Sequence, residues 1–207
     1  GLGISHYQKG DYEEAIINYN KAIKLKPDYA GAFINLATAY TKSNHHEKAI
    51  RKYRAALQLQ PSLTLAYNNL GSYLHEIGEL EDAKKNYEKA ITLKPNNAEA
   101  YLNLAIIYKE ARLYVEAIAA YKEAIKLDPE SHDLFYNNGT CLQEIGKLED
   151  AKRNYCNALM LEPSYADVYF KLGQLLTILG QFEDCFKHYR KLSSLAPDDP
   201  GLYNDLG

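Results

Sequence analysis

The sequence predicts an all-α solenoid, an array of antiparallel helix pairs in which no single central core exists. The first observation is a period of 34 residues, marked along the 207-residue chain by prolines at Pro27, Pro61, Pro95, Pro129, Pro163 and Pro197. The second is the spacing of apolar residues within each period, at i, i+3, i+4 and i+7, which is typical of one helix face. Periods of roughly 20 to 50 residues indicate repeat architectures, in which each unit packs only against its neighbours.

Each repeat contains two helical patterns joined by a short turn. In the repeat 30–63, the first has its apolar face at Phe33, Leu36, Ala37 and Tyr40, and the second at Ala49, Tyr53 and Ala56. The small residues allow two backbones to approach closely, and the aromatic rings fill the space beside them. Each proline then ends the second helix, because proline cannot donate the next backbone hydrogen bond.

The turn between the two helices has its own repeating position, occupied by Gly10, Asn44, Gly78, Gly146 and Gly180. Glycine and asparagine tolerate the left-handed conformation that commonly ends a helix. The corresponding residue of the repeat 98–131 is Arg112. We expect either local strain or a different turn geometry there.

The period also divides the chain. It predicts one solenoid domain over 1–207, with a partial repeat at 1–29, full repeats at 30–63, 64–97, 98–131, 132–165 and 166–199, and the start of a further repeat at 200–207. Leu2 and Gly3 already lie within a first helix, and terminal repeats of an array normally carry a polar outer face. We therefore expect a segment of a longer array, or one whose ends a partner covers.

The framework residues resemble those of the tetratricopeptide repeat family over essentially the whole chain. In one repeat they are Tyr67, Leu70, Gly71, Ala83, Tyr87 and Ala90, and in the next Tyr101, Leu104, Ala105, Ala117, Tyr121 and Ala124. The resemblance implies a right-handed superhelical array with a concave groove lined by the first helices. It therefore implies a protein-interaction function.

Four asparagines recur at one position of the first helices, namely Asn35, Asn69, Asn103 and Asn137. In tetratricopeptide arrays this position faces the groove, so the resemblance implies a ladder of amides there. A carboxamide offers an acceptor and two donors, enough to bind both the C=O and the N–H of an extended peptide. The alternative is that these amides bind only water. The position becomes Lys171 in the repeat 166–199, where the ladder ends.

The neighbouring position carries hydrophobic or aromatic residues toward the C-terminus, namely Leu102, Tyr136 and Phe170. Buried aromatic anchors carry much of the energy in protein interfaces, so these three are candidate side-chain pockets of the same groove. The alternative is that one or two of them pack against the next helix.

Composition excludes several other classes of function. The formal net charge is −3 and no basic stripe is visible, so we expect no nucleic-acid partner. No apolar stretch approaches the ~18 residues of a membrane span, so we expect no membrane insertion. Three irregularly spaced cysteines favour free thiols and a cytoplasmic location. The six histidines lack metal-ligand spacing, so we expect no metal, no cofactor and no enzyme activity.

The expected function is a protein–protein interaction scaffold that binds an extended peptide or a partner helix in its concave groove. One alternative is a substrate-recruiting arm of a larger enzyme, such as an O-linked glycosyltransferase. Another is an architectural subunit of a large assembly, in ciliary or secretion machinery. Binding of the acidic tails of heat-shock chaperones is disfavoured, because the positions of the required basic clamp hold Ile34, Leu102 and Tyr136.

Overall fold

The computed structural model describes residues 1–195, and over that range it contains twelve α-helices and no strand. The first six are α1 (Leu2–Gln8), α2 (Tyr12–Leu25), α3 (Ala30–Lys42), α4 (His46–Leu59), α5 (Thr64–Glu76) and α6 (Leu80–Leu93). The remaining six are α7 (Ala98–Glu110), α8 (Tyr114–Leu127), α9 (His132–Glu144), α10 (Leu148–Leu161), α11 (Ala166–Ile178) and α12 (Phe182–Leu195). The predicted all-α repeat fold is confirmed. The expected start of a further repeat at 200–207 lies outside the described residues.

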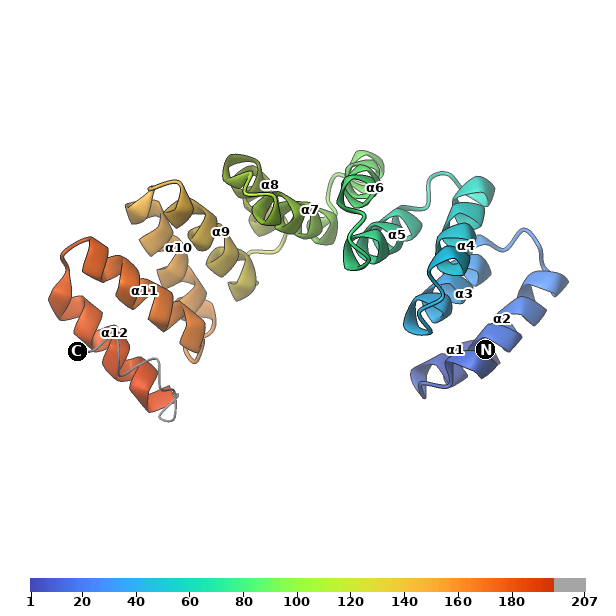
Figure 1. Ribbon diagram of the computed structural model, residues 1–207, viewed down its shortest axis with the longest axis horizontal. Coiled ribbons are helices and arrows are strands. Elements are labelled where there is room, and N and C mark those ends of the chain that lie inside the picture. The colour runs from blue at the N-terminus through green and yellow to red at the C-terminus, as the bar shows by residue number, and fades with distance from the viewer. Residues whose placement is uncertain (196–207) are drawn as a thin grey trace. The chain divides into compact units, whose positions relative to one another are not determined.

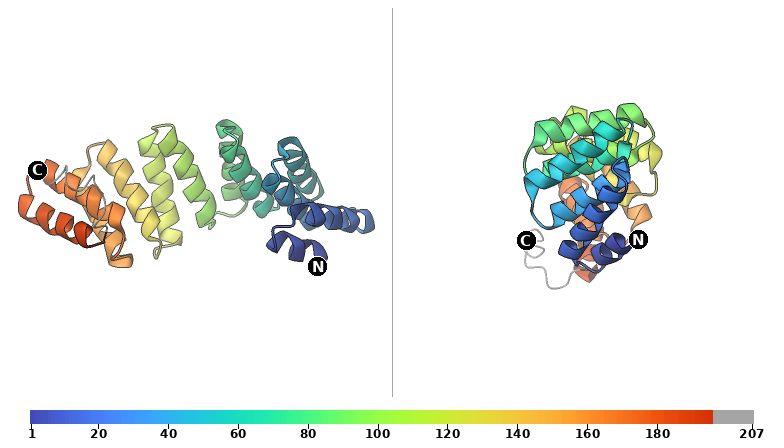
Figure 2. Two further views of the ribbon diagram at one scale, coloured as in Figure 1. Left: turned by 60° about the horizontal axis from the view of Figure 1, so that its bottom comes forward. Right: turned by 90° about the vertical axis from the view of Figure 1, so that its right-hand side faces the viewer.

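Successive helices form antiparallel pairs, as the ribbon shows from three directions (Figures 1 and 2). Within each pair the helices contact one another directly, for example α3 with α4, α5 with α6 and α9 with α10. The first helices of the complete pairs begin 34 residues apart, at Ala30, Thr64, Ala98, His132 and Ala166. One supersecondary unit is therefore repeated in register with the sequence period.

The chain forms two compact units, an N-terminal unit from Gly1 to Ala100 and a C-terminal unit from Tyr101 to Gly207. In the N-terminal unit, Ala15, Ile16, Tyr19, Leu36 and Ala39 form one buried cluster. In the C-terminal unit a larger cluster extends from Ala105 to Leu192. Each unit thus has its own hydrophobic core between neighbouring helix pairs.

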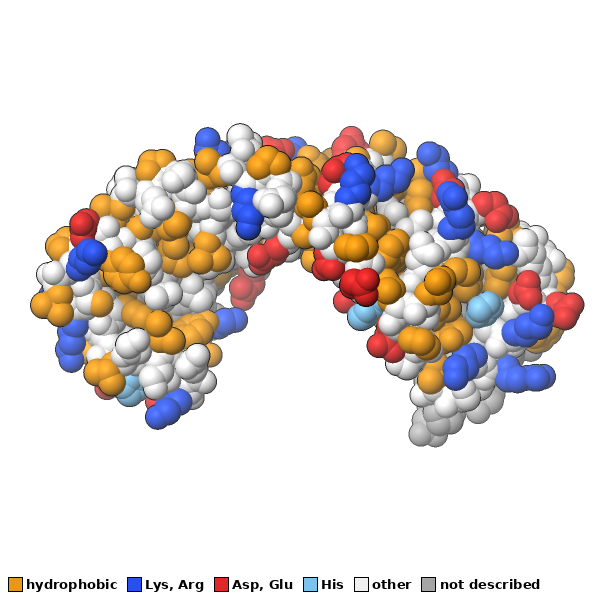
Figure 3. Space-filling model, turned by 180° about the vertical axis from the view of Figure 1, so that it is seen from behind, with side chains coloured by type: hydrophobic (Ala, Val, Ile, Leu, Met, Phe, Trp, Pro, Cys, Tyr) orange, Lys and Arg blue, Asp and Glu red, His pale blue; other side chains and the backbone are white. Residues whose placement is uncertain are grey.

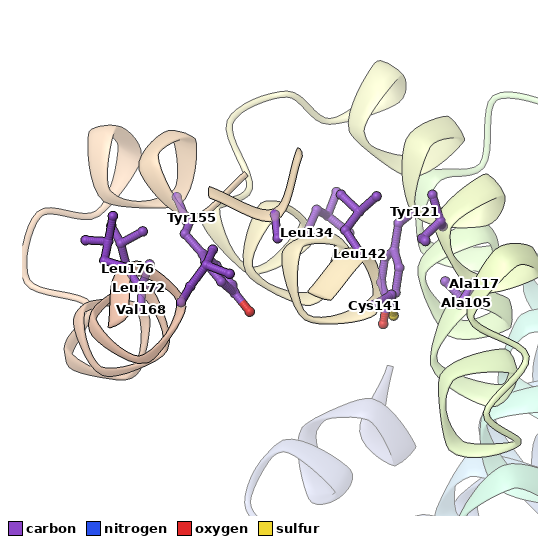
Figure 4. Packing of buried hydrophobic residues seen from close by; sticks show 14 of the residues in the cluster. Ala105, Ala117, Tyr121, Leu134, Cys141, Leu142, Tyr155, Val168, Leu172 and Leu176 are labelled. Carbon is purple, nitrogen blue, oxygen red and sulfur yellow. The ribbon is translucent and has the colours of Figure 1, made fainter. Parts of the chain in front are cut away.

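The framework alanines and tyrosines form the centre of these cores. Ala117 and Tyr121 of α8 are both fully buried. Figure 4 shows Tyr121 beside Cys141, and Ala117 next to Ala105 of α7. Burial in this core raises the pKa of the Cys141 thiol to about 11. A side chain larger than alanine at Ala117 would have to displace this packing.

The turn position is left-handed in every repeat that the structure describes. Its glycines have φ between 70° and 84°, and Asn44 and Arg112 have φ of 57° and 58°. Of the two expectations for Arg112, the structure supports strain, because the arginine adopts the same geometry as the glycines. A non-glycine residue in this region is disfavoured by contacts of its Cβ with the backbone.

The second helices end two residues before the prolines that were predicted to stop them. For example, α2 ends at Leu25 before Pro27 and α6 at Leu93 before Pro95. The residue between them still donates its N–H to the last turn, as Lys26 does to the carbonyl of Ala22. Pro197 lies outside the described residues. No helix in the described range 1–195 is long and apolar enough to cross a membrane.

Candidate functional site

The four candidate asparagines occupy the sixth position of consecutive first helices, α3, α5, α7 and α9. All four side chains are partly buried rather than fully exposed. Asn35 and Asn69 belong to the N-terminal unit, and Asn103 and Asn137 to the C-terminal unit. Each unit therefore contains one pair of these amides.

In the N-terminal unit, Asn69 lies in a polar groove of about 200 Å³ between first helices. The groove is lined by Thr38, Thr41, Lys42, Tyr53, Asn69, Ser72, Tyr73, Glu76 and Glu99. The hydroxyls of Thr38 and Tyr53 are 3.1 Å apart and hydrogen-bonded. Burial raises the pKa of Tyr53 to about 12, so its hydroxyl stays protonated at neutral pH. The groove thus presents neutral donors and acceptors, with charged groups from Lys42, Glu76 and Glu99.

Asn35 lies in a different pocket of the same unit. That pocket measures about 360 Å³, and its walls include Tyr19, Leu25, Tyr29 and Ala32 beside Asn35. These walls are largely apolar, in contrast to the groove around Asn69. The structure therefore gives the two amides of the N-terminal unit different surroundings.

A second asparagine of α5 is missing from the predicted site. Asn68 is 4% exposed, and its Nδ2 donates to Oε2 of Glu99 at 3.4 Å. Its Oδ1 is buried without a partner in the described structure. Glu99 lies in the first turn of α7, where a carboxylate favours the helix dipole, and the contact with Asn68 adds a second role. The signal in the sequence was the break in the apolar series at this position, Ile34–Asn68–Leu102.

In the C-terminal unit, the amide of Asn137 already has two partners. Its Oδ1 accepts a hydrogen bond from Nζ of Lys109 at 2.6 Å. Its Nδ2 donates to the carbonyl of Asp133, one turn earlier in α9, at 2.8 Å. Lys109 was absent from the predicted site, and it places a positive charge beside this amide.

The predicted side-chain pockets of the C-terminal unit are partly buried. Leu102, Tyr136 and Phe170 all pack against its core cluster, and Lys171 is partly buried on α11. The ring of Tyr136 lies 5.3 Å from that of Tyr165, centroid to centroid. The hydroxyl of Tyr165 donates to Oδ1 of Asp133 at 2.8 Å. Burial, with Asp167 nearby, raises the pKa of Tyr136.

Side chains that could bind a metal do not assemble in the described part of the chain. Among residues 1–195, no set of three histidine, cysteine, aspartate or glutamate side chains could hold a metal ion. The three cysteines are free. On the face shown in Figure 3, basic and acidic side chains are interspersed with hydrophobic ones.

Solved structures similar to this chain are tetratricopeptide-type helical arrays at low sequence identity. PilF of Pseudomonas aeruginosa is 20% identical with a TM-score of 0.81, covering 99% of this chain and 93% of that one. YrrB, described as a TPR protein with an unusual peptide-binding site, is 22% identical with a TM-score of 0.78, covering 90% and 96%. MamA is 22% identical with a TM-score of 0.76, covering 81% and 92%. At this identity the likeness shows the fold.

Sequence comparison adds the family. No curated protein sequence matches the chain. A family model matches residues 2–199, which is nearly the whole chain, and it describes the C-terminal domain of cilia and flagella-associated protein 70. The expected tetratricopeptide nature of the chain is thereby confirmed. The chain belongs to the tetratricopeptide family of the cilia and flagella-associated protein 70 C-terminal domain.

Proposed function

We propose that this tetratricopeptide scaffold binds extended peptide main chain through Asn35 and Asn69 in its N-terminal unit and through Asn103 and Asn137 in its C-terminal unit. The observation that carries the proposal is the polar groove around Asn69, where Thr38 and Ser72 of neighbouring first helices line the same space. Amide and hydroxyl groups can pair with backbone N–H and C=O of an extended segment without selecting its side chains. Such a groove suits a scaffold that holds main chain.

Side-chain selection comes from the neighbouring position in the C-terminal unit. Leu102, Tyr136 and Phe170 are partly buried and partly accessible, as expected of walls that accept a ligand's side chains. Lys109 must release Oδ1 of Asn137 before that oxygen can accept a peptide N–H. The freed ammonium can then bind a peptide carbonyl or an acidic side chain. YrrB, which has the same fold, is described as having a peptide-binding site, and this supports the general mode.

The test compares two quadruple variants. One replaces Asn35, Asn69, Asn103 and Asn137 by alanine. The matched control replaces four other asparagines, Asn20, Asn86, Asn96 and Asn157, by alanine, and none of these lines the pockets around Asn35 or Asn69. Peptides selected from a random display library against the wild-type chain serve as probes, and affinity is measured by fluorescence polarisation. Each lost amide should weaken binding by about 0.5–1.5 kcal/mol, so the first variant should lose roughly 2–6 kcal/mol if the sites are independent.

The control variant should keep wild-type affinity, and both variants should keep the wild-type circular-dichroism spectrum. Equal affinities for the two quadruple variants would refute main-chain binding by the asparagines. Tyr136→Ala should instead change which peptides the library returns, because the ring contacts side chains.

A second candidate function is an architectural subunit of a ciliary or flagellar assembly. The observation in its favour is the family, whose description names a cilia and flagella-associated protein. In that case the contacts with the assembly need not involve the asparagines. Expression of the tagged chain in ciliated cells tests this function. Accumulation along the cilium, unchanged in the quadruple asparagine variant, would favour the architectural candidate over the peptide groove.

A further inference from the structure

The charge of α4 differs from that of the other second helices. It contains four cationic residues, Lys48, Arg51, Lys52 and Arg54, and a single carboxylate, Glu47, for a formal charge of +3. By the same count α2, α6, α8 and α10 are neutral and α12 has a charge of +1. A chain with a net charge of −3 therefore concentrates positive charge on one helix.

One substitution in the repeat pattern causes much of this difference. In five second helices the same first-turn position holds an acid, namely Glu14, Asp82, Glu116, Asp150 and Asp184. In α4 that position holds Lys48. The replacement removes a negative charge and adds a positive one at a place where the other repeats agree.

In three of these five helices, α6, α10 and α12, the acid pairs with a cation three residues later. Asp82 pairs with Lys85 at 2.9 Å, and Asp184 pairs with Lys187 at 3.1 Å. In α4 the corresponding cation is Arg51, and its partner position is Lys48. None of the ion pairs among residues 1–195 involves Lys48, Arg51 or Lys52. Three adjacent positive charges thus remain without a carboxylate.

These cations line a pocket together with aromatic and apolar groups. The pocket measures about 340 Å³, and its walls are Tyr40, Lys48, Arg51, Lys52 and Ala55. Nζ of Lys48 lies 5.6 Å from the ring centroid of Tyr40, a cation–π contact. Nζ of Lys52 lies at the same distance from the ring of Phe33. The rings hold the two ammonium groups in place at the surface while leaving them unneutralised.

We propose that this basic pocket (Tyr40, Lys48, Arg51, Lys52 and Ala55) is a second binding surface, which takes an acidic, extended segment of a partner protein. Phe33 and Tyr40 are seven residues apart on α3, so the ammonium groups above them are spaced about 10 Å along the helix. One phosphate cannot reach both positions. Carboxylates on alternate residues of an extended chain, spaced about 7 Å apart, can follow such a row of cations. Tyr40 and Ala55 supply apolar contact for the residues between.

A substitution of Lys48 can separate a loss of binding from a loss of folding. A cation in the first turn of a helix is disfavoured by the helix dipole, and an acid there is favoured. Lys48→Asp restores both the pattern of the other repeats and a partner for Arg51. It should therefore raise the melting temperature, by about 1–4 °C, while weakening the binding of an acidic segment. Loss of binding cannot then be attributed to unfolding.

The probe is a capped, fluorescein-labelled peptide of alternating glutamate and alanine, with a glutamine–alanine peptide as its uncharged counterpart. We expect saturable binding of the acidic peptide by the wild-type chain, weakened at about 0.5 M salt relative to 0.05 M. Lys48→Asp should weaken it about tenfold, because an attraction becomes a repulsion. Lys122→Asp, on an exposed position of α8, makes the same change in net charge and should leave the affinity unchanged. The quadruple asparagine variant should also bind the acidic peptide normally.

Several results would overturn the proposal. The first is that the wild-type chain binds the acidic and the uncharged peptide with equal affinity. The second is that Lys48→Asp and Lys122→Asp lose the same affinity for the acidic peptide, and the third is that Lys48→Asp loses none. Displacement of the peptide by inorganic phosphate at equal concentration would show a phosphate site instead. Co-sedimentation with phosphatidylserine vesicles in the absence of acidic-peptide binding would show a membrane surface instead.

Discussion

Overpacking of a framework alanine is the most direct test of how the repeats are held together. Ala117 is fully buried in the core of the C-terminal unit, beside Ala105 of α7 in Figure 4. Ala117→Leu adds an isopropyl group where no space is left, so side chains or backbone must move. Such overpacking costs about 1–3 kcal/mol. For a unit of roughly 100 residues, 1 kcal/mol corresponds to about 4–8 °C in melting temperature.

The matched control is Ala119→Leu, the same substitution on the same helix at an exposed position. Both variants are heated while ellipticity at 222 nm is recorded. We expect Ala117→Leu to melt at least about 4 °C below wild type, and Ala119→Leu to stay within about 2 °C of it. If both variants melt together with the wild type, close packing at the framework alanines does not hold the units together.

Two further predictions concern the turns and the buried tyrosines. Arg112→Gly should stabilise the C-terminal unit by about 0.5–1 kcal/mol, because the left-handed φ of 58° disfavours arginine. Gly146→Ala should destabilise the same unit by a similar amount. Urea unfolding measures both changes, and a loss of stability in Arg112→Gly would contradict the strain at this turn. Burial raises the pKa of Tyr53 and of Tyr87 to about 12, from an ordinary value near 10. The contribution of these two protonated hydroxyls to the stability of the fold is therefore complete below pH 10 and is lost as the pH rises through 12. Absorbance at 295 nm should show late-titrating tyrosines that unfolding in urea moves to about pH 10, and a single transition near pH 10 in the folded chain would contradict the burial.

The sequence was sufficient to predict the features that packing imposes on every repeat. The 34-residue period, the buried alanines and tyrosines, and the prolines beyond the second helices were all read from recurring residues. Each of them serves the same local contact in each repeat, so the pattern is visible six times. At Arg112 the repeat pattern alone does not determine the geometry of the turn. A single departure fits either a strained turn or a new geometry, and only the backbone angle distinguishes the two.

The surroundings of the predicted site residues were less accessible from sequence. Lys109 contacts Asn137 across 28 positions of the chain, and the contact depends on the rotamers of two long side chains. Asn35 and Asn69 share a position in the repeat, yet they line pockets of different polarity. The reason is physical, because a groove residue meets side chains of adjacent helices that vary from repeat to repeat. Periodicity locates such a residue but does not determine what it touches.

Residues that depart from the repeat pattern differ in their effect on stability and in the groups that they expose to solvent. Asn138 replaces a framework leucine and is 3% exposed. Its Nδ2 donates to Oδ1 of Asn154 at 2.9 Å, whereas its own Oδ1 is buried without a partner in the described structure. The change at Asn138 therefore affects the core and not the surface.

Lys48 lies in a first turn, where the helix dipole disfavours it, and no carboxylate pairs with it. Its ammonium contacts the ring of Tyr40, and this cation–π contact leaves the positive charge unneutralised. Together with Arg51 and Lys52, Lys48 therefore presents three positive charges outward beside the rings of Phe33 and Tyr40. A residue that the helix dipole disfavours, and whose charge no internal carboxylate neutralises, is explained by an external partner, and the sign of its charge requires that partner to be acidic.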